Sequence, residues 1–191
     1  MNTSAYVALT DAVRAWNASA PSEFRIREPG VSQDTLRRTE ARLGLKLPAD
    51  YSAFLILSNG WASTGDTLGV RGLRAVENIA QFAEAEAGWL ASWQDADPDA
   101  DDPSIALMRR ATVLSTPGER ALLLDPLTRD PSSGEPMCVF FDNDAPAIAG
   151  SPRSFTAALM ELCERQPPLT ATHPGHICTT RRIVDLQTLS R

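Results

Sequence analysis

The stretch LGLKLPADYSAFLILSNGW, residues 43–61, constrains the fold more than any other part of this sequence. Pro48 suits the first position of a helix, because proline lacks the N–H that would have no intrahelical acceptor there. From Tyr51 onward, apolar residues recur three and four positions apart, which is typical of a helix with one buried face. The pair Asn59-Gly60 favours positive φ and ends such a helix. The sequence therefore predicts a helix over about residues 48–58, with Phe54 in its buried face.

Further helices are predicted on both sides of this stretch. Residues 4–17 have the apolar spacing of an amphipathic helix. Ser32 is a suitable N-cap for a helix that ends at Gly44, because a serine hydroxyl accepts from the free amides of the first turn. Residues 76–93 carry one apolar stripe and are expected to form a continuous helix. Ser151-Pro152 is expected to open the last helix.

The second half of the chain predicts strands. Strand-like runs occupy Leu68–Leu73, Ala111–Leu114, Ala121–Asp125 and Met137–Asp142, and shorter candidates occupy Ala145–Ala149 and Ile177–Val184. Pro117-Gly118 supplies a turn, so the second and third runs should form an antiparallel hairpin. Residues 95–104 are expected to be a polar loop. Because helices come first and strands follow, the order indicates an α+β fold and not a doubly wound parallel sheet.

Composition and cysteine usage limit the classes of protein to which this chain can belong. The chain has 191 residues, with 43% hydrophobic and 22% charged residues, as in ordinary globular domains. We expect a single domain over residues 1–191. No apolar run approaches the roughly 18 residues of a membrane span, so no membrane contact is expected. Cys138, Cys163 and Cys178 are odd in number and widely spaced, which argues against a secreted disulfide framework and favours the cytoplasm.

Acidic residues are concentrated in one window. Residues 75–108 contain eight acids and no Lys or Arg, a formal charge of −8, whereas the whole chain carries −6. The rest of the chain is therefore slightly basic, at +2. Such a local field repels nucleic acid and attracts a basic partner.

The same window contains large aromatic residues. On a continuous helix, Phe82, Trp89 and Trp93 would fall in one line beside the acidic loop. Aromatic anchors next to a steering charge are typical of a protein-binding surface. Two simpler interpretations remain: the aromatics belong to a wide core stripe, and the acids form a solvated loop. The predicted partner-binding residues are Glu84, Glu86, Trp89, Trp93, Asp95, Asp97, Asp99, Asp101 and Asp102.

Signals for catalysis, cofactors and metals are weak. No G-x-S-x-G or G-x-x-x-x-G-K-S/T motif occurs, and the chain has two histidines. His173, His176 and Cys178 follow no standard zinc spacing and have no evident fourth ligand. The DADPDADD run from Asp95 has Ala100 and Ala106 where an EF-hand loop needs Gly and Glu. We therefore expect no enzyme activity, no cofactor and no metal.

The order of motifs resembles the SUKH superfamily. The resemblance rests on Val31-Ser32, Leu36, Glu40, the LG-x-x-LP-x-DY-x-x-FL-x-x-SNG pattern that ends at Gly60, the later LLLD and VFFD runs, and a final SF helix. It covers about residues 25–165, is weakest over the acidic helix-loop segment 75–108, and leaves out the tail 167–191. The superfamily includes a fungal cell-wall assembly regulator and bacterial immunity proteins of polymorphic toxin systems.

The resemblance implies a fold and a mode of action. N-terminal helices should pack on a mixed, mainly antiparallel sheet with a C-terminal helix, and the protein should act by binding another protein. The leading hypothesis is an immunity protein that neutralises a cognate bacterial toxin. A basic toxin such as a nuclease would suit the acidic window, because its substrate groove must be positive. The alternative is a regulatory or scaffolding module in cell-envelope or signalling assembly, and the oligomeric state stays open.

Overall fold

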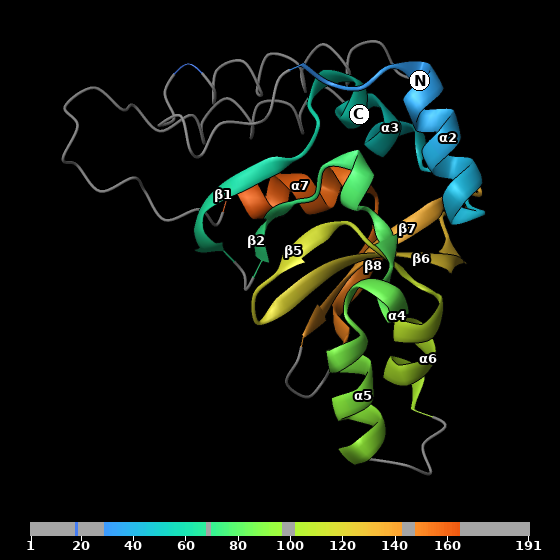
Figure 1. Ribbon diagram of the computed structural model, residues 1–191, viewed down its shortest axis with the longest axis vertical. Helices are drawn as coiled ribbons and strands as arrows, with labels where there is room; N and C mark the ends of the chain where they lie inside the picture. Colours follow the sequence, from blue (N-terminus) through green and yellow to red (C-terminus); the bar gives the residue numbers. More distant parts are fainter. Residues whose placement is uncertain (1–17, 19–28, 68–69, 97–101, 143–147, 165–191) are drawn as a thin grey trace, which may run out of the picture.

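The computed structural model describes residue 18 and the ranges 29–67, 70–96, 102–142 and 148–164. Helices α2 (Gln33–Leu43) and α3 (Ala49–Leu57) lie at one end of this part, and α5 (Ala87–Ala96) lies at the other. Two sheets and helix α7 (Phe155–Glu164) occupy the middle (Figure 1). The predicted helix over 4–17, the predicted strand over 177–184 and the tail 167–191 lie outside the described residues.

Helices α2 and α3 begin and end close to their predicted positions. The Ser32 hydroxyl accepts a hydrogen bond from the Thr35 amide at 3.2 Å, and Gly44 ends α2 with φ 62°. Pro48 is the N-cap of α3, one position before the predicted one. The helix ends at Ser58, whose extended backbone (φ −150°) leads into the turn. Local capping and periodicity therefore account for both elements.

The strands form two sheets, and every strand pair among the described residues is antiparallel. The three-stranded sheet has the order β1-β2-β5, with bounds Trp61–Thr67, Val70–Leu73 and Ser115–Pro117. The five-stranded sheet has the order β3-β4-β6-β7-β8, with bounds Ala80–Gln81, Thr112–Val113, Arg120–Arg129, Pro136–Asp142 and Ile148–Arg153. The predicted hairpin is confirmed by the β4–β6 pairing of Val113 with Leu123. The α+β class is confirmed as well.

The predicted continuous helix over residues 76–93 is wrong. The segment divides into the 3₁₀ turn η2 (Val76–Asn78), strand β3, helix α4 (Phe82–Ala85) and helix α5. Glu86 separates the two helices with φ −129° and ψ 43°. The reason is tertiary: β3 pairs with β4, and the Phe82 amide donates to the Ala111 carbonyl at 2.8 Å. These sheet contacts override the helical periodicity of the local sequence.

Three other boundaries differ from expectation. Strand β1 begins directly at Trp61 and was not predicted. Helix α6 (Pro103–Arg110) begins inside the expected loop, because Asp102 caps it and proline is tolerated in its first turn. Ser151-Pro152 belongs to β8, whose Arg153 pairs with Cys138 of β7. Helix α7 therefore begins three residues later than predicted, after Ser154.

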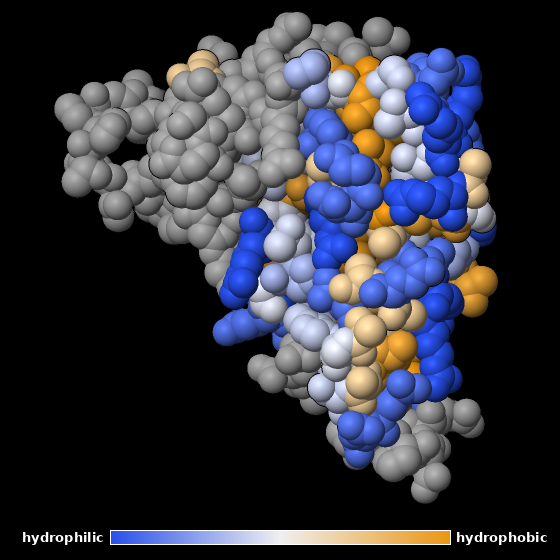
Figure 2. Space-filling model, in the orientation of Figure 1, coloured by the Kyte–Doolittle hydropathy of each residue, from blue (hydrophilic) through white to orange (hydrophobic). Residues whose placement is uncertain are grey.

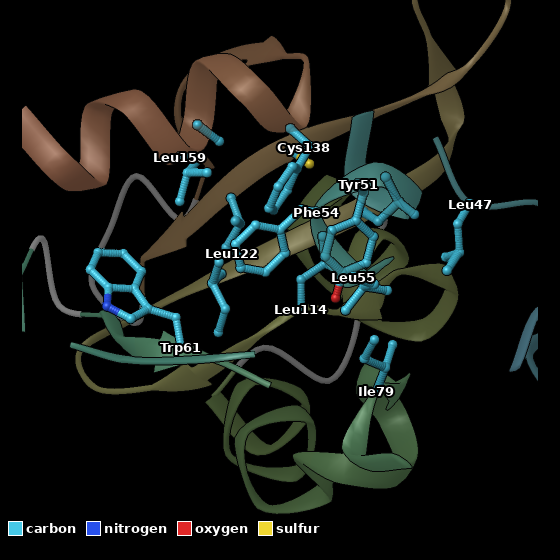
Figure 3. Close-up of a cluster of buried hydrophobic side chains, with 14 of the residues drawn as sticks. Leu47, Tyr51, Phe54, Leu55, Trp61, Ile79, Leu114, Leu122, Cys138 and Leu159 are labelled. Carbon is cyan, nitrogen blue, oxygen red and sulfur yellow. The ribbon is translucent and has the colours of Figure 1, made fainter. Parts of the chain in front are cut away.

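Buried side chains form two clusters, one on each face of the five-stranded sheet. The first joins α3 to α7, where Phe155 lies 4.5 Å from Tyr51 and 5.3 Å from Phe54 between ring centroids. Tyr51 and Phe54 lie side by side in this cluster, with Trp61 towards one end (Figure 3). Phe54 is fully buried, as predicted. The second cluster contains Phe82 and residues of α6, β6 and β7, and it supports α5.

Candidate partner-binding surface

Helix α5 is held to the second cluster by its two tryptophans. The Trp89 ring lies 5.9 Å from that of Phe82 and 6.2 Å from that of Phe141, and Trp93 lies 5.7 Å from Phe141. Both tryptophans are half-buried, whereas Phe82 is fully buried on the neighbouring helix α4. The predicted line of three aromatics on one helix is therefore wrong, because the chain breaks at Glu86. The tryptophans fix α5 in place with part of their surface and leave the rest accessible.

The opposite face of α5 exposes small residues. The exposed residues of this helix are Ala87, Gly88, Ala91, Ser92 and Asp95. Helix α5 lies at the lower end of the described part in Figure 1. Figure 2 shows pale orange and white atoms, the colours of apolar and intermediate residues, in this lower region with hydrophilic residues beside them. A partner can therefore approach the helix closely along this face.

The acidic residues of the window have different environments. Glu84 on α4 and Asp95 near the end of α5 are exposed. Asp102 accepts from the Ser104 amide at 2.7 Å and caps α6, so its carboxylate has a structural role. Asp97, Asp99 and Asp101 lie outside the described residues. The acids that the structure brings to the α4–α5 surface are therefore Glu84 and Asp95.

Glu86 lies at the junction of α4 and α5 and has an internal partner. Its carboxylate forms an ion pair with the guanidinium of Arg74, and both side chains are mostly buried. Its amide donates to the Phe82 carbonyl at 2.8 Å, and its own carbonyl accepts from the Trp89 amide at 3.0 Å. A buried pair of this kind fixes the junction, since removing one partner would leave the other charge uncompensated. No local pattern in the sequence indicates that Glu86 pairs with Arg74.

The Ser-Asn-Gly turn that follows α3 is tied to the segment after β2. The Asn59 side chain accepts from the Val76 amide at 2.8 Å and donates to the Glu77 carboxylate at 3.1 Å. Gly60 has φ 91°, and a Cβ at this position would lie 2.8 Å from the Ala75 backbone nitrogen. The turn therefore needs glycine both for its conformation and for the close approach.

A pocket of about 470 Å³ lies beside this turn. Its lining includes Trp61, Arg71, Arg74, Glu77, Asn78 and Thr116. These residues come from β1, β2, the segment directly after β2, η2 and β5. Their separation in sequence explains why the sequence does not indicate the pocket. The lining includes one acid of the 75–108 window, Glu77, which is not among the predicted partner-binding residues.

Metal and nucleophile candidates in the described part are few. Within the ranges that the structure describes, no group of three His, Cys, Asp or Glu side chains is placed to hold a metal. His173, His176 and Cys178 lie outside these ranges, so the prediction for that cluster stays a prediction. Burial raises the pKa of the Cys138 thiol well above its usual range, which disfavours the reactive thiolate. None of the described helices is long and apolar enough to cross a membrane.

The family assignment follows from comparison with known sequences. The model of the SMI1 / KNR4 family (SUKH-1) matches residues 30–159, which is more than half of the chain. The protein therefore belongs to the SMI1 / KNR4 family of the SUKH superfamily, as the motif around Asn59-Gly60 predicts. A search of curated proteins found no match. The family includes immunity proteins and regulators, which act by binding other proteins.

Proposed function

We propose that this protein is a non-enzymatic immunity protein that neutralises a cognate bacterial toxin by direct binding. The single observation that supports this most is the construction of α5. Its inner face is anchored by Trp89 and Trp93, whereas its outer face presents Ala87, Gly88 and Ala91 to solvent. The accessible parts of the half-buried Trp89 and Trp93 rings offer the aromatic surface that protein interfaces favour, and the small side chains beside them allow a partner to approach closely.

The charge of this region supports a basic partner. Glu84 and Asp95 are exposed at the two ends of the α4–α5 surface, and the sequence places Asp97, Asp99 and Asp101 directly after it. A cluster of negative charges on a surface speeds association with a positively charged protein and repels nucleic acid. A nuclease toxin, with its positive substrate groove, fits this requirement. In this proposal the bound immunity protein covers the groove and thereby excludes the substrate.

The test combines capture with a protection assay. The tagged protein is purified from its native cells and its partner is identified by mass spectrometry. That partner is then expressed alone and together with this protein. We expect expression of the partner alone to stop growth, co-expression to restore it, and Ala91→Arg to abolish the protection. A partner that does not impair growth when expressed alone would contradict the immunity proposal.

A second candidate function is a regulatory or scaffolding role in cell-envelope or signalling assembly. It is supported by the family, which contains regulators as well as immunity proteins. The same capture distinguishes the two, because a scaffold should recover components of an assembly that are harmless when expressed alone.

A further inference from the structure

The pocket beside the Ser-Asn-Gly turn has the elements of a ligand site separate from α5. Val70 pairs with Pro117 and Leu73 with Ser115, so Arg71 of β2 and Thr116 of β5 are neighbours on the sheet. Both side chains are exposed and line the pocket. The volume of about 470 Å³ falls in the range of small-ligand sites, roughly 300–1,000 Å³.

Among the residues that the structure describes, the two arginines of the pocket differ in their partners. Arg74 is fully engaged: its Nε donates to the Ser115 carbonyl at 2.7 Å, a terminal nitrogen donates to the Asn78 carbonyl at 3.2 Å, and the other pairs with Glu86. Glu77 accepts from the Asn59 amide group. The Arg71 guanidinium, by contrast, makes no hydrogen bond or ion pair with a residue in the described part of the chain. Its planar guanidinium is the donor that matches a carboxylate in two parallel hydrogen bonds.

The remaining lining contains both apolar and polar residues. Ala80 and Ala85 line the pocket and are half-buried. Trp61, Leu73 and Ala75 also contribute to the lining, with at most 4% of their surface exposed. The polar side chains of Asn78 and Thr116 are exposed at the pocket. A ligand that suits both kinds of residue, together with the Arg71 guanidinium, has an apolar body and one anionic end. The carboxylates of Glu77 and Glu86 lie close by and would repel a dianion such as phosphate more than a monoanion.

We propose that this pocket binds a carboxylate attached to an apolar group, with Arg71 as its ion-pair partner and Thr116 and Asn78 as hydrogen-bond donors. The carboxylate belongs either to a free small acid or to the C-terminus of a peptide chain, since both present the same group. This proposal does not depend on the immunity function, because it concerns β2, η2 and β5 and not the exposed face of α5.

The experiment is a titration of the full chain followed by ¹H–¹⁵N NMR. The probes are N-acetyl-leucine, an acetylated tetrapeptide ending in leucine, and the C-terminally amidated forms of both. We expect the two carboxylate probes to cause saturable shifts of the backbone amide signals of Arg71, Asn78 and Thr116. The amidated probes should bind at least tenfold more weakly. Equal affinity for the acid and the peptide indicates a site for free acids, whereas tighter peptide binding indicates a site for C-termini.

Variants at exposed arginines provide the matched control. Arg71→Ala should weaken carboxylate binding at least tenfold, and Arg71→Lys should recover part of it. Arg109→Ala removes another exposed arginine, at the end of α6, and should leave binding unchanged. Both sites are on the surface, so neither variant should unfold. The proposal would be overturned if neither carboxylate caused saturable shifts, or if Arg71→Ala bound the carboxylates as tightly as the unchanged protein does.

Discussion

Asp50 of α3 accepts two hydrogen bonds from Thr156 in the first turn of α7, one from the backbone amide at 2.8 Å and one from Oγ1 at 3.0 Å. Its other oxygen accepts from the Tyr51 amide at 2.8 Å. One carboxylate therefore joins the beginnings of two helices that lie far apart in sequence. This contact gives a structural reason for an aspartate after Leu47-Pro48 in the family pattern, because it positions α7 against the first hydrophobic cluster.

Replacing Asp50 should destabilise the protein through α7. Asp50→Ala removes the acceptor of the Thr156 amide and should lower the free energy of unfolding by about 1–2 kcal/mol, as expected for the loss of a helix cap. Urea denaturation measures this change. Asp34→Ala is the matched control, since the Asp34 carboxylate is exposed and pairs with Arg37 only on the surface of α2. It should change stability by less than about 0.5 kcal/mol. Equal effects of the two variants would show that Asp50 does not cap α7.

Gly60 should tolerate no side chain, whereas Gly134, which also has positive φ, should tolerate one. Gly60→Ala combines the strain of φ 91° with a Cβ placed 2.8 Å from the Ala75 nitrogen. Gly134 has φ 71° with no atom within 4 Å of such a Cβ, so Gly134→Ala should cost only about 1 kcal/mol of backbone strain. Thermal unfolding of both variants should show the larger loss at Gly60. A smaller loss there than at Gly134 would mean that the turn moves away from Ala75 at little cost.

Truncation in the first cluster should have a large effect. Phe54 is fully buried between Tyr51 and Phe155, so Phe54→Ala should cost about 3–5 kcal/mol, from lost burial and the cavity that remains. Leu127 is 73% exposed, and Leu127→Ala should change the free energy of unfolding by less than about 0.5 kcal/mol. Chemical denaturation of the two variants tests the position of the core. A loss below about 1 kcal/mol at Phe54 would contradict its place in the centre of the cluster.

Low pH should reduce the free energy of unfolding of the protein, in part through Asp125. Burial raises the pKa of this carboxyl, but hydrogen bonds from Arg110, Thr128 and the Leu127 amide outweigh burial and hold the pKa below its ordinary value. The folded state therefore binds this proton less readily than the unfolded state. The stabilisation is present above about pH 4, the usual pKa of an unfolded Asp, and is lost as the pH falls through the folded pKa.

The corresponding variant is Asp125→Asn, compared with the unchanged protein by urea denaturation at pH 7, 5, 4 and 3. We expect the difference in unfolding free energy to be largest at pH 7 and 5 and to shrink below pH 4. Thr128→Val removes one of the hydrogen bonds that lower the pKa of Asp125, so the acid-induced loss should become smaller and be complete at a higher pH. A difference that stays constant from pH 7 to 3 would rule out a contribution from this carboxyl.

The proposed binding face of α5 can be tested without disturbing the core. Ala91→Arg places a bulky cation on the exposed face of α5 and should weaken binding of the captured partner at least tenfold, mainly through faster dissociation. Ala41→Arg makes the same change on the exposed face of α2, at the other end of the described part in Figure 1, and should have no effect. Surface plasmon resonance measures both rates. Unchanged kinetics with Ala91→Arg would remove α5 from the interface.

The same assay also tests whether the acids increase the rate of association with the partner. Changing Asp95, Asp97, Asp99 and Asp101 to Asn, and leaving the helix cap Asp102 intact, should slow association most strongly at low salt. Dissociation should change little, because exposed charges at a distance act mainly on encounter. An association rate that is independent of these substitutions at low salt would show that the acids do not guide the partner.

Local signals in the sequence were sufficient for helices α2 and α3 and for the β4–β6 hairpin. Ser32, Gly44 and Pro48 act on amides and dihedral angles within one turn of themselves, so their effect does not depend on the rest of the chain. The α+β class followed from the order of the predicted helices and strands, and the resemblance to the SUKH superfamily implied the same class. The burial of Phe54 followed from helical periodicity alone.

Only the tertiary structure decided how the acidic window is arranged. Its periodicity favoured one long helix, but pairing of Ala80-Gln81 with β4 and the ion pair of Glu86 with Arg74 divide it. The partners of these contacts lie elsewhere in the sequence, and their free energy exceeds the small helical preference of a few residues. The pocket at Arg71 arises in the same way, from strands β2 and β5 that meet only when the chain has folded. Side chains that act through such long-range contacts are not marked by any pattern in the residues next to them. For this reason the sequence predicts Glu86 as a partner-binding residue and not as the partner of Arg74.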